Sequence, residues 1–376
     1  MKILKIATIG LLGLVAVVAL LVFLITSIHP AFGTKPGQAL YEQFEATGHF
    51  RDGIFFNQMQ TDLDMNRKTI VSVLKDYVTG IPNQQPEEPL PVLKTQLEDV
   101  LDVPDSVTRV VWFGHSAFLV QIGGKNILLD PMFGDTPAPL SFLGGKRFSD
   151  GLPIEIEELP QIDLLILSHD HYDHLDYPSI LKLKSKIKQY YVPLGVGGHF
   201  LRWGVPEEDV IEMDWWQTIV IDDLQLTCTP SRHFSGRSLT DRNTTLWSSW
   251  VIKSSFKSIY FSGDGGYGPH FKEIGDRLGP FDFAMMECGQ YDERWGQIHM
   301  MPEETAVAAK ELGAETFMPI HWGSFVLALH SWNDPVLRVS AKALEIDQPI
   351  LVPRIGELID LYQIDDISSD WWQDLL

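Results

Sequence analysis

Four side chains capable of holding a metal ion stand close together in the segment 168–176, which reads SHDHYDHLD. They follow directly after the apolar run DLLIL and are His169, His171, Asp173 and His174. In an extended turn alternate side chains point the same way, so His169 and His171 can bind one cation. Asp173 and His174 can then reach a second cation a few ångströms away. The spacing therefore predicts a metal centre with two ions.

Three more candidate ligands each follow a predicted strand: His233 after LTCTPSR, Asp264 after SIYFSG and His321 after ETFMPI. Ligands at the same ends of neighbouring strands converge on one edge of a sheet, where loops shape a pocket without disturbing the core. A single histidine is more often a surface or capping group, but no packing requirement explains the whole cluster. Zinc is the ion we expect for histidine and carboxylate ligands, and manganese and iron accept the same ligands.

Several other residues have more than one interpretation. Asp130, in LDPMF, either fixes the tautomer of a ligand histidine or caps the turn after KNILL. Lys146 and Arg147 either offer positive charge to a phosphate head group or are solvated in a loop. Tryptophans such as Trp295 and the pair at 215–216 either line an acyl groove, meet a bilayer interface or belong to the core.

Apolar runs indicate the elements that must position these residues. Three runs, the last two joined at Gly123-Gly124, predict an antiparallel meander: Thr108–Phe113, Ala117–Ile122 and Lys125–Leu129. Further predicted strands alternate with helical stretches: Asp163–Leu167, Leu224–Cys228, Ser258–Phe261, Phe281–Met286 and Glu315–Ile320. One helix should begin at Asp176-Tyr177-Pro178 and another at Pro302. We expect an α/β (α+β) chain with mixed sheets covered by helices.

The N-terminal run Ile6–Ile25 contains twenty residues without a charge. At helical rise this length matches the hydrocarbon core of a bilayer, which is roughly 30 Å thick. No convincing cleavage site follows the run, so an uncleaved anchor is favoured over a signal peptide. Lys2 and Lys5 precede it, and the positive-inside rule then places the rest of the chain outside the cytoplasm. We expect a single-pass, membrane-anchored protein with an extracytoplasmic catalytic domain.

Length and composition set the limits for the remainder of the chain. Its 376 residues carry 29 Lys and Arg against 50 Asp and Glu, and the net charge of -21 excludes nucleic acid as a natural partner. With only two cysteines, Cys228 and Cys288, no disulfide framework or all-cysteine zinc site can form. We divide the chain into an anchor (1–33), an extended approach segment (34–105), a catalytic domain (106–365) and a C-terminal tail (366–376).

The motif HDHYDH, together with the three downstream ligands, resembles the metallo-β-lactamase superfamily, whose fold is an αββα sandwich. Within it, the chain is similar to the family of N-acyl-phosphatidylethanolamine-hydrolysing phospholipases D. The similarity runs from about Val107 to about Glu357, and the blocks that carry it are LDPMF, GGKRF, SHDHYDHLDY, VPLG, DWW, GDGGY, GPFD and HWGSF.

The resemblance implies two zinc ions with a shared ligand, and residue types agree with the family at every ligand position. The two sets and the bridging residue are His169, His171 and His233; Asp173, His174 and His321; and Asp264. The chain departs from the family at Gly265, where the pattern GDTGY has Thr, and at Ile298, where a relative has Gln. We expect the metal geometry to survive the first change.

The resemblance further implies catalytic roles for Asp173 and for His299, which lies in HMMPEETA near the expected leaving group. His299, Tyr291, Lys146 and Arg147 are the candidate substrate-binding residues. A hydroxide bridging the two ions would attack the phosphodiester, and His299 or a water would protonate the departing alkoxide. The implied products of N-acyl-phosphatidylethanolamine are an N-acylethanolamine and phosphatidic acid.

Other functions remain open at this point. The same centre can hydrolyse a lactone, a β-lactam or a soluble phosphodiester, because the nucleophile also attacks carbonyl carbon. A redox di-iron protein or a structural metal module is a third class, but the oxidoreductases of the superfamily usually have Glu where this chain has His171. The expected partners are a phospholipid substrate and a membrane, and a homodimer is left open.

Overall fold

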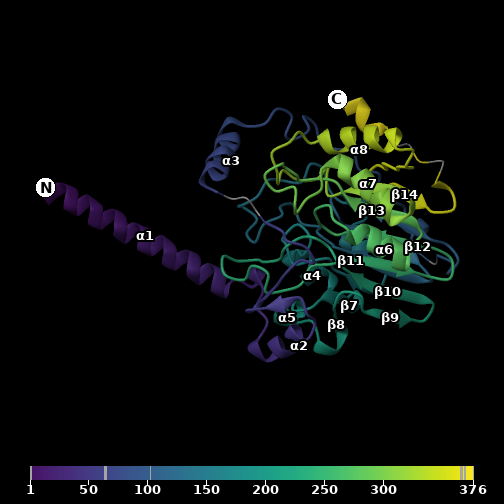
Figure 1. Ribbon diagram of the computed structural model, residues 1–376, viewed down its shortest axis with the longest axis horizontal. Helices are drawn as coiled ribbons and strands as arrows, with labels where there is room; N and C mark the ends of the chain where they lie inside the picture. Colours follow the sequence, from purple (N-terminus) through teal and green to yellow (C-terminus); the bar gives the residue numbers. More distant parts are fainter. Residues whose placement is uncertain (1, 63–65, 102, 365–366, 368–369, 376) are drawn as a thin grey trace.

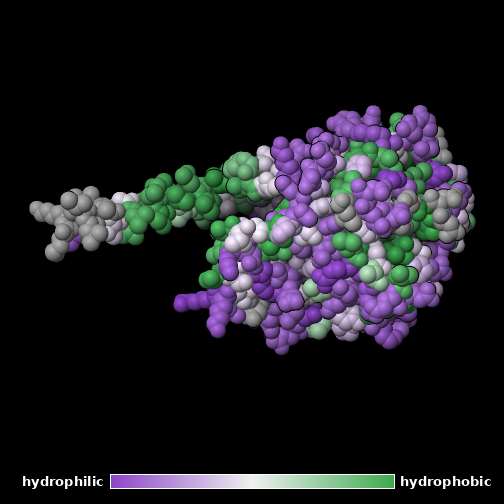
Figure 2. Space-filling view, turned by 90° about the horizontal axis from the view of Figure 1, so that it is seen from above, coloured by the Kyte–Doolittle hydropathy of each residue, from purple (hydrophilic) through white to green (hydrophobic). Residues whose placement is uncertain are grey.

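The computed structural model describes residues 2–62, 66–101, 103–364, 367 and 370–375. Its first element, α1 (Lys2–Ile28), projects from the rest of the chain as a single long helix (Figure 1). The stretch Thr8–Ile28 is long and apolar enough to cross a membrane, and none of its most apolar window is buried. Its surface is apolar along most of its length (Figure 2). Anchors and signal sequences share these properties.

The first of two large sheets has seven strands in the order β15-β3-β4-β5-β6-β7-β8. Their bounds are β3 Arg109–Trp112, β4 Phe118–Ile122, β5 Lys125–Leu129, β6 Ile162–Ile166, β7 Ile187–Pro193, β8 Val210–Met213 and β15 Leu358–Asp360. The predicted meander is confirmed, because β3, β4 and β5 pair antiparallel, with Val110 opposite Val120 and Val120 opposite Ile127. From β5 to β8 the pairing is parallel.

The second sheet has six strands in the order β14-β13-β12-β11-β10-β9. Their bounds are β9 Thr218–Ile221, β10 Leu224–Thr229, β11 Ser249–Lys253, β12 Ser258–Phe261, β13 Phe281–Glu287 and β14 Ala314–Ile320. The strands β12, β13 and β14 are parallel to one another, and the others pair antiparallel. The sequence analysis did not predict β7, β8, β9, β11 or β15.

The two sheets pack face to face with helices on both outer sides. Side chains from both sheets, such as Trp112 and Trp250, share the central core. The outer face of the first sheet packs with Ile180 and Phe200, and the outer face of the second with Ile274. The covering helices are α4 Tyr177–Leu183, α5 Gly197–Arg202, α6 His270–Leu278, α7 Pro302–Leu312 and α8 Asp334–Glu345. The expected αββα sandwich is confirmed.

Both predicted helix starts lie where the sequence indicated. The side chain of Asp176 accepts a hydrogen bond from the Ser179 amide and caps α4, whose first turn contains Pro178. Helix α7 begins at Pro302, and the side chain of Glu304 accepts from the Met301 amide. Single-turn 3-10 helices complete the described chain: Pro30–Phe32, Gln38–Leu40, Leu97–Asp99, Ile156–Glu158, Glu207–Asp209 and Trp371–Leu375.

The approach segment differs from its description as extended chain. It contains α2 (Tyr41–Glu45), a hairpin of β1 (Phe50–Arg51) with β2 (Ile54–Phe55), and α3 (Arg67–Thr79). Phe44 and Phe55 are fully buried in the central core, so the first part of this segment belongs to the folded domain. Elements of two to five residues are too short to show a period, which explains why α2 and the hairpin were missed.

Candidate metal centre

The seven candidate ligands come together at one edge of the sandwich. His169, His171, Asp173 and His174 lie in the loop after β6, and His321 directly follows β14. His233 and Asp264 lie in the loops after β10 and β12. In one sheet β10, β12 and β14 alternate with β11 and β13, and β6 lies in the other sheet. The loops after these strands bring together residues more than a hundred positions apart, such as Asp173 and His321.

The first cluster consists of His169, His171 and His233. Nδ1 of His171 lies 2.9 Å from Nε2 of His169 and 3.2 Å from Nε2 of His233. Burial lowers the pKa of His171 to about 4 and holds the pKa of the other two rings well below the usual value. The three rings are therefore neutral near pH 7, and neutral imidazole nitrogens are what a metal ion binds.

The second cluster consists of Asp173, His174 and His321, with Asp264 between the two clusters. Nε2 of His174 lies 3.5 Å from Oδ2 of Asp173 and 3.1 Å from Oδ2 of Asp264. The same Oδ2 of Asp264 lies 3.8 Å from Nε2 of His169 and from Nε2 of His233. Asp264 also approaches Nδ1 of His321 at 2.9 Å through its other oxygen. It is thus the residue shared by both clusters.

These residues fit divalent metal ions. Despite these close approaches, the buried atoms Nε2 of His174 and Oδ1 of Asp264 make no well-aligned hydrogen bond within the described part of the chain. Such an arrangement is costly unless a cation lies between them. Burial alone would lower the pKa of His174, but the carboxylates of Asp264 and Asp173 outweigh it and hold that pKa well above the usual value. The site therefore demands positive charge, which divalent cations supply.

Residues behind the ligands hold the rings in place. The Asp130 carboxylate lies 2.6 Å from Nδ1 of His174 and accepts from the Ser168 amide at 2.7 Å. This contact with a ligand ring agrees with the first interpretation of Asp130, that it fixes the tautomer of a ligand histidine. The far nitrogen of His233, Nδ1, lies 2.9 Å from the carbonyl oxygen of Ile298. Such contacts fix which ring nitrogen faces the metal.

His115, in the turn between β3 and β4, is a residue that the sequence analysis missed. Its ring is fully buried, and Nε2 lies 2.9 Å from Oδ2 of Asp173. Burial and the neighbouring His321 lower the pKa of His115 to about 3, so the neutral ring donates Nε2–H to the carboxylate. The ligand-type atoms of His115, Asp173, His174 and His321 all lie within 4.8 Å of one another. Nothing around GHSAF in the sequence marks it, because its partner lies 58 positions away.

His299 lies between the two clusters and is oriented by a second missed residue, Glu287. Nδ1 of His299 lies 2.9 Å from Oε1 of Glu287, and the Met300 amide donates to the other oxygen at 3.0 Å. Burial raises the pKa of Glu287 well above its usual value and lowers the pKa of His299, so both groups favour their neutral forms. The Nε2 edge of His299 is then left for the cavity.

A cavity of about 330 Å³ opens over the centre. Its lining combines ligands with apolar and polar side chains: His171, Asp173, Phe234, Asp264, Gln290, Trp295, Ile298, His299, His321 and Leu327. Trp295, Leu327 and Phe234 form the apolar part of this wall. An apolar portion of a substrate can therefore lie beside the metal ligands.

Three candidate substrate residues do not line this cavity in the described part of the chain. Arg147 is half-buried. Its guanidinium donates to the carbonyl oxygens of Phe113, Met132 and Gly134. Its neighbour Lys146 is exposed. The Tyr291 hydroxyl donates to Asp334 instead of pointing at the centre. The structure therefore gives Arg147 and Tyr291 packing roles that their position in the sequence could not reveal.

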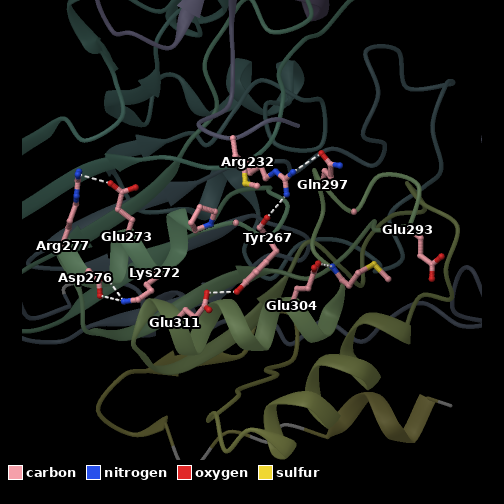
Figure 3. A pocket seen from close by; sticks show the side chains of 15 residues that line it. Arg232, Tyr267, Lys272, Glu273, Asp276, Arg277, Glu293, Gln297, Glu304 and Glu311 are labelled. Atoms are coloured by element: carbon pink, nitrogen blue, oxygen red, sulfur yellow. Dashed lines mark hydrogen bonds and ion pairs between the residues drawn. The ribbon is translucent and has the colours of Figure 1, made fainter. Parts of the chain in front are cut away.

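The segment 296–301 separates the centre from a larger hollow of about 1120 Å³ (Figure 3). In it, Arg232 donates to the Tyr267 carbonyl at 2.9 Å and to the side-chain oxygen of Gln297 at 3.0 Å. Gln297 therefore points away from the metal ligands, and Ile298 lines the centre instead. The hydrogen bonds of Arg232 fix the loop that carries the next residue, His233.

Residues 125–322 match the family model described as a beta-lactamase superfamily domain. An uncharacterised protein of Mycobacterium tuberculosis is 37% identical over 321 residues, which cover 84% of this chain and 85% of that protein. The N-acyl-phosphatidylethanolamine-hydrolyzing phospholipase D 1 of Caenorhabditis elegans is 34% identical over 226 residues, 57% of this chain and 63% of that protein. Among solved structures, the metallo hydrolase Igni18 of Ignicoccus hospitalis has a similar fold, with a TM-score of 0.51 at 22% identity over 68% of this chain and 98% of that chain.

Proposed function

Because the chain belongs to the metallo-β-lactamase superfamily and is a metal-dependent hydrolase by fold and family, we propose that it is a zinc-dependent phosphodiesterase of the phospholipase D type. Its substrate would be N-acyl-phosphatidylethanolamine, and its products N-acylethanolamine and phosphatidic acid. The similarity to the Caenorhabditis elegans enzyme supports this substrate, as does that to the mitochondrial N-acyl-phosphatidylethanolamine-hydrolyzing phospholipase D of Saccharomyces cerevisiae, 32% identical over 66% of this chain.

The observation that carries the proposal is the pair of ligand clusters joined by Asp264. Oδ2 of Asp264 lies 3.8 Å from Nε2 of His169 in one cluster and 3.1 Å from Nε2 of His174 in the other. Two carboxylates, the buried Asp264 and the half-buried Asp173, keep their negative charge among the ligand histidines, so the protein leaves negative charge for cations to balance. Two divalent ions would satisfy this arrangement, and zinc suits the ligand types.

Zinc ions bound by these residues would lower the pKa of water toward neutrality and offset the charge of a phosphoryl group. The protein's own residues orient the metal ligands and exclude water from the centre. His115 holds one oxygen of Asp173 at 2.9 Å and so fixes the direction of the other. Nε2 of His299 is left for the cavity and can give its proton to the leaving alkoxide. The neutral carboxyl group of Glu287, 2.9 Å from Nδ1, then gives its own proton to the ring, so that the imidazole stays neutral. Trp295 and Leu327 shield the centre from bulk water.

A membrane location completes the proposal. The exposed apolar helix α1 would anchor the chain, with residues 1–33 as the anchor and 106–365 as the catalytic domain. Lys2 and Lys5 favour an extracytoplasmic domain. An anchor keeps the centre close to a substrate that does not leave the bilayer, so attraction by a basic surface is unnecessary in a chain with a net charge of -21.

The test is hydrolysis of N-acyl-phosphatidylethanolamine in vesicles by the full-length, zinc-loaded protein. We expect release of N-acylethanolamine that stops on addition of a chelator and returns with zinc. His171→Ala should abolish release, because it removes the nitrogen shared by two contacts of the first cluster. His49→Gln is the matched control, because that ring pairs with Asp214 outside the centre.

Two outcomes would overturn the assignment in different ways. The protein could cleave lactones, β-lactams or soluble phosphodiesters in a chelator-sensitive way and release nothing from vesicles. That result would agree with a metallohydrolase and refute the lipid substrate. Equal release by wild type and His171→Ala would refute the metal centre as the catalyst.

A further inference from the structure

Helix α3 (Arg67–Thr79) has its apolar face turned away from the protein. Five apolar side chains follow one helical stripe, and their exposed fractions are Ile70 41%, Val71 65%, Leu74 58%, Tyr77 55% and Val78 87%. No residue of this helix is buried in the described structure. A helix on the surface of a water-soluble domain normally shows the opposite arrangement, with the apolar stripe toward the core.

The opposite face of α3 is polar and contacts the domain. Asp76 accepts from the guanidinium of Arg294 at 2.8 Å, and the hydroxyl of Ser72 accepts from the same guanidinium at 3.1 Å. Only Thr69, Val73 and Asp76 are half-buried. The helix is therefore held by polar contacts and presents its apolar stripe to the outside.

The position of α3 indicates what covers this stripe. It lies at the end of the long axis from which α1 projects (Figure 1). Arg67, Lys68 and Lys75 give the exposed surface of the helix three positive charges, whereas the chain as a whole carries -21. An apolar stripe flanked by cations is the pattern of a helix that lies flat in a lipid head-group region.

We propose that α3 lies in the lipid–water interface of the membrane that α1 crosses, with its apolar stripe among the acyl chains and its cations beside anionic head groups. This inference rests on the anchoring proposed above and adds a second membrane contact to it.

The contact also orients the metal centre. Arg294, which holds Asp76 of α3, donates to Asp292 at 2.6 Å, and its neighbour Trp295 lines the cavity over the ligands. Gln297 in the same segment accepts from the amide of Asp62, a few residues before α3. Seating α3 in the interface therefore places the wall of the cavity next to the lipid surface.

The experiment places a fluorescent label on single cysteines of the full-length protein. The protein is reconstituted in vesicles of phosphatidylcholine and phosphatidylglycerol, and a spin-labelled lipid in these vesicles quenches the fluorescence of any label close to it. Val78→Cys reports on the apolar stripe. Leu344→Cys is the matched control, because Leu344 is 84% exposed on α8, which lies farther than α3 from the projecting helix α1 along the long axis (Figure 1). Ser72→Cys is a second control, on the polar face of α3. The native Cys228 and Cys288 are buried and should not react.

We expect the label at position 78 to be quenched at least threefold more strongly than the labels at 72 and 344. Equal quenching at all three positions, in protein that sediments with the vesicles, overturns the interfacial helix and leaves the anchor intact. If the label at position 78 is shielded without lipid and the protein has twice the mass of one chain, a second copy of the chain covers the stripe, and the interfacial helix is overturned. Protein that does not sediment with vesicles overturns both the anchor and the helix. None of these results depends on hydrolysis of any lipid.

Discussion

Burial sets the charge of some groups at the metal centre, and neighbouring charges set that of the others. The rings of His169 and His233 are neutral because they are buried beside other histidines, which holds their pKa well below the usual value. Asp173 keeps its charge for a different reason. Burial would raise its pKa, but His174 and the hydrogen bond from His115 outweigh that effect and hold it well below the usual value. Neutral rings and charged carboxylates are the states in which these groups bind metal ions.

His115 should act as a positioning residue. His115→Phe removes the donor to Asp173 while filling the same space, and we expect metal affinity or kcat to fall about 10- to 100-fold. His115→Gln restores a donor and should recover part of the loss. Competition with a chelating dye, together with kcat and KM, provides the measurement. A merely structural role would lower stability in both variants alike and leave the metal affinity of the folded fraction unchanged.

His270, at the start of α6, should make stability depend on pH. Burial and the nearby Arg232 lower its pKa to about 3 in the folded protein, whereas the unfolded chain has the ordinary value of 6.5. Between these values only the unfolded chain binds the proton, so the free energy of unfolding is highest above pH 6.5 and falls as the pH drops. The slope from this group is about 1.4 kcal/mol per pH unit.

His270→Phe should reduce that slope by one proton. Urea unfolding of both metal-loaded proteins between pH 7 and about pH 5 measures the difference, because the ligand histidines titrate equally in the two. Parallel stability curves for wild type and variant would show that His270 binds its proton in the folded state.

At the scale of elements, the centre depends on loops that approach each other closely at the ends of parallel strands. Gly289, just after β13, lies against the peptide of His321, just after β14. A Cβ at Gly289 would lie 1.9 Å from the His321 carbonyl oxygen. The absence of a side chain therefore allows the β13 and β14 loops to bring their ligand and its neighbours together.

Gly289→Ala should displace His321. We expect unfolding free energy to fall by about 1–3 kcal/mol from overpacking, and the ion held by His321 to bind more weakly. Gly296→Ala is the control within the same region, because its nearest contact would be an ordinary 3.7 Å to the Asp292 carbonyl. Thermal unfolding and metal titration compare the two. A Gly289→Ala protein with unchanged metal affinity would contradict this role of the close approach.

The sequence predicts those features whose signal is local. The strands before His169, Asp264 and His321 are apolar runs, so both the strands and the convergence of the ligands follow from them. His115 and Glu287 were missed because each acts through a partner that the fold brings near. The contacts of the Arg147 guanidinium with three carbonyl groups were not predicted, because nothing in a loop sequence shows which way a side chain turns. Helix α3 was not predicted either, because residues 34–80 showed no clear period and were assigned to the extended approach segment.

At the scale of the whole molecule, the chain just after α1 is part of the folded domain. The Ala31 carbonyl accepts from the Arg237 guanidinium, and the Thr34 amide donates to His199 at 2.9 Å. Trp203 donates to the Pro30 carbonyl at 2.8 Å. Arg237 also donates to the carbonyl of Leu175, next to the ligand His174. Helix α1 and the ligand loop are thus connected through a few buried polar groups.

A truncation that tests the anchor should therefore end before these contacts. Deletion of residues 1–25 removes most of the apolar run of α1 and keeps Pro30, Ala31 and Thr34 in place. The full-length protein should stay in membranes through alkaline carbonate extraction, and the truncated protein should be released. If the truncated protein resists extraction, α1 is not the integral anchor. If salt alone removes the truncated protein from membranes, the result agrees with a peripheral contact through α3.

The central claim is that two ligand clusters share Asp264 and hold two metal ions. Elemental analysis of purified full-length protein, together with His233→Ala and His321→Ala variants verified as folded by circular dichroism, tests it most directly. We predict two zinc ions per wild-type chain and about one in each variant, because each substitution removes a ligand from a different cluster. A single ion per wild-type chain, or the same content in all three proteins, would contradict the two-ion centre.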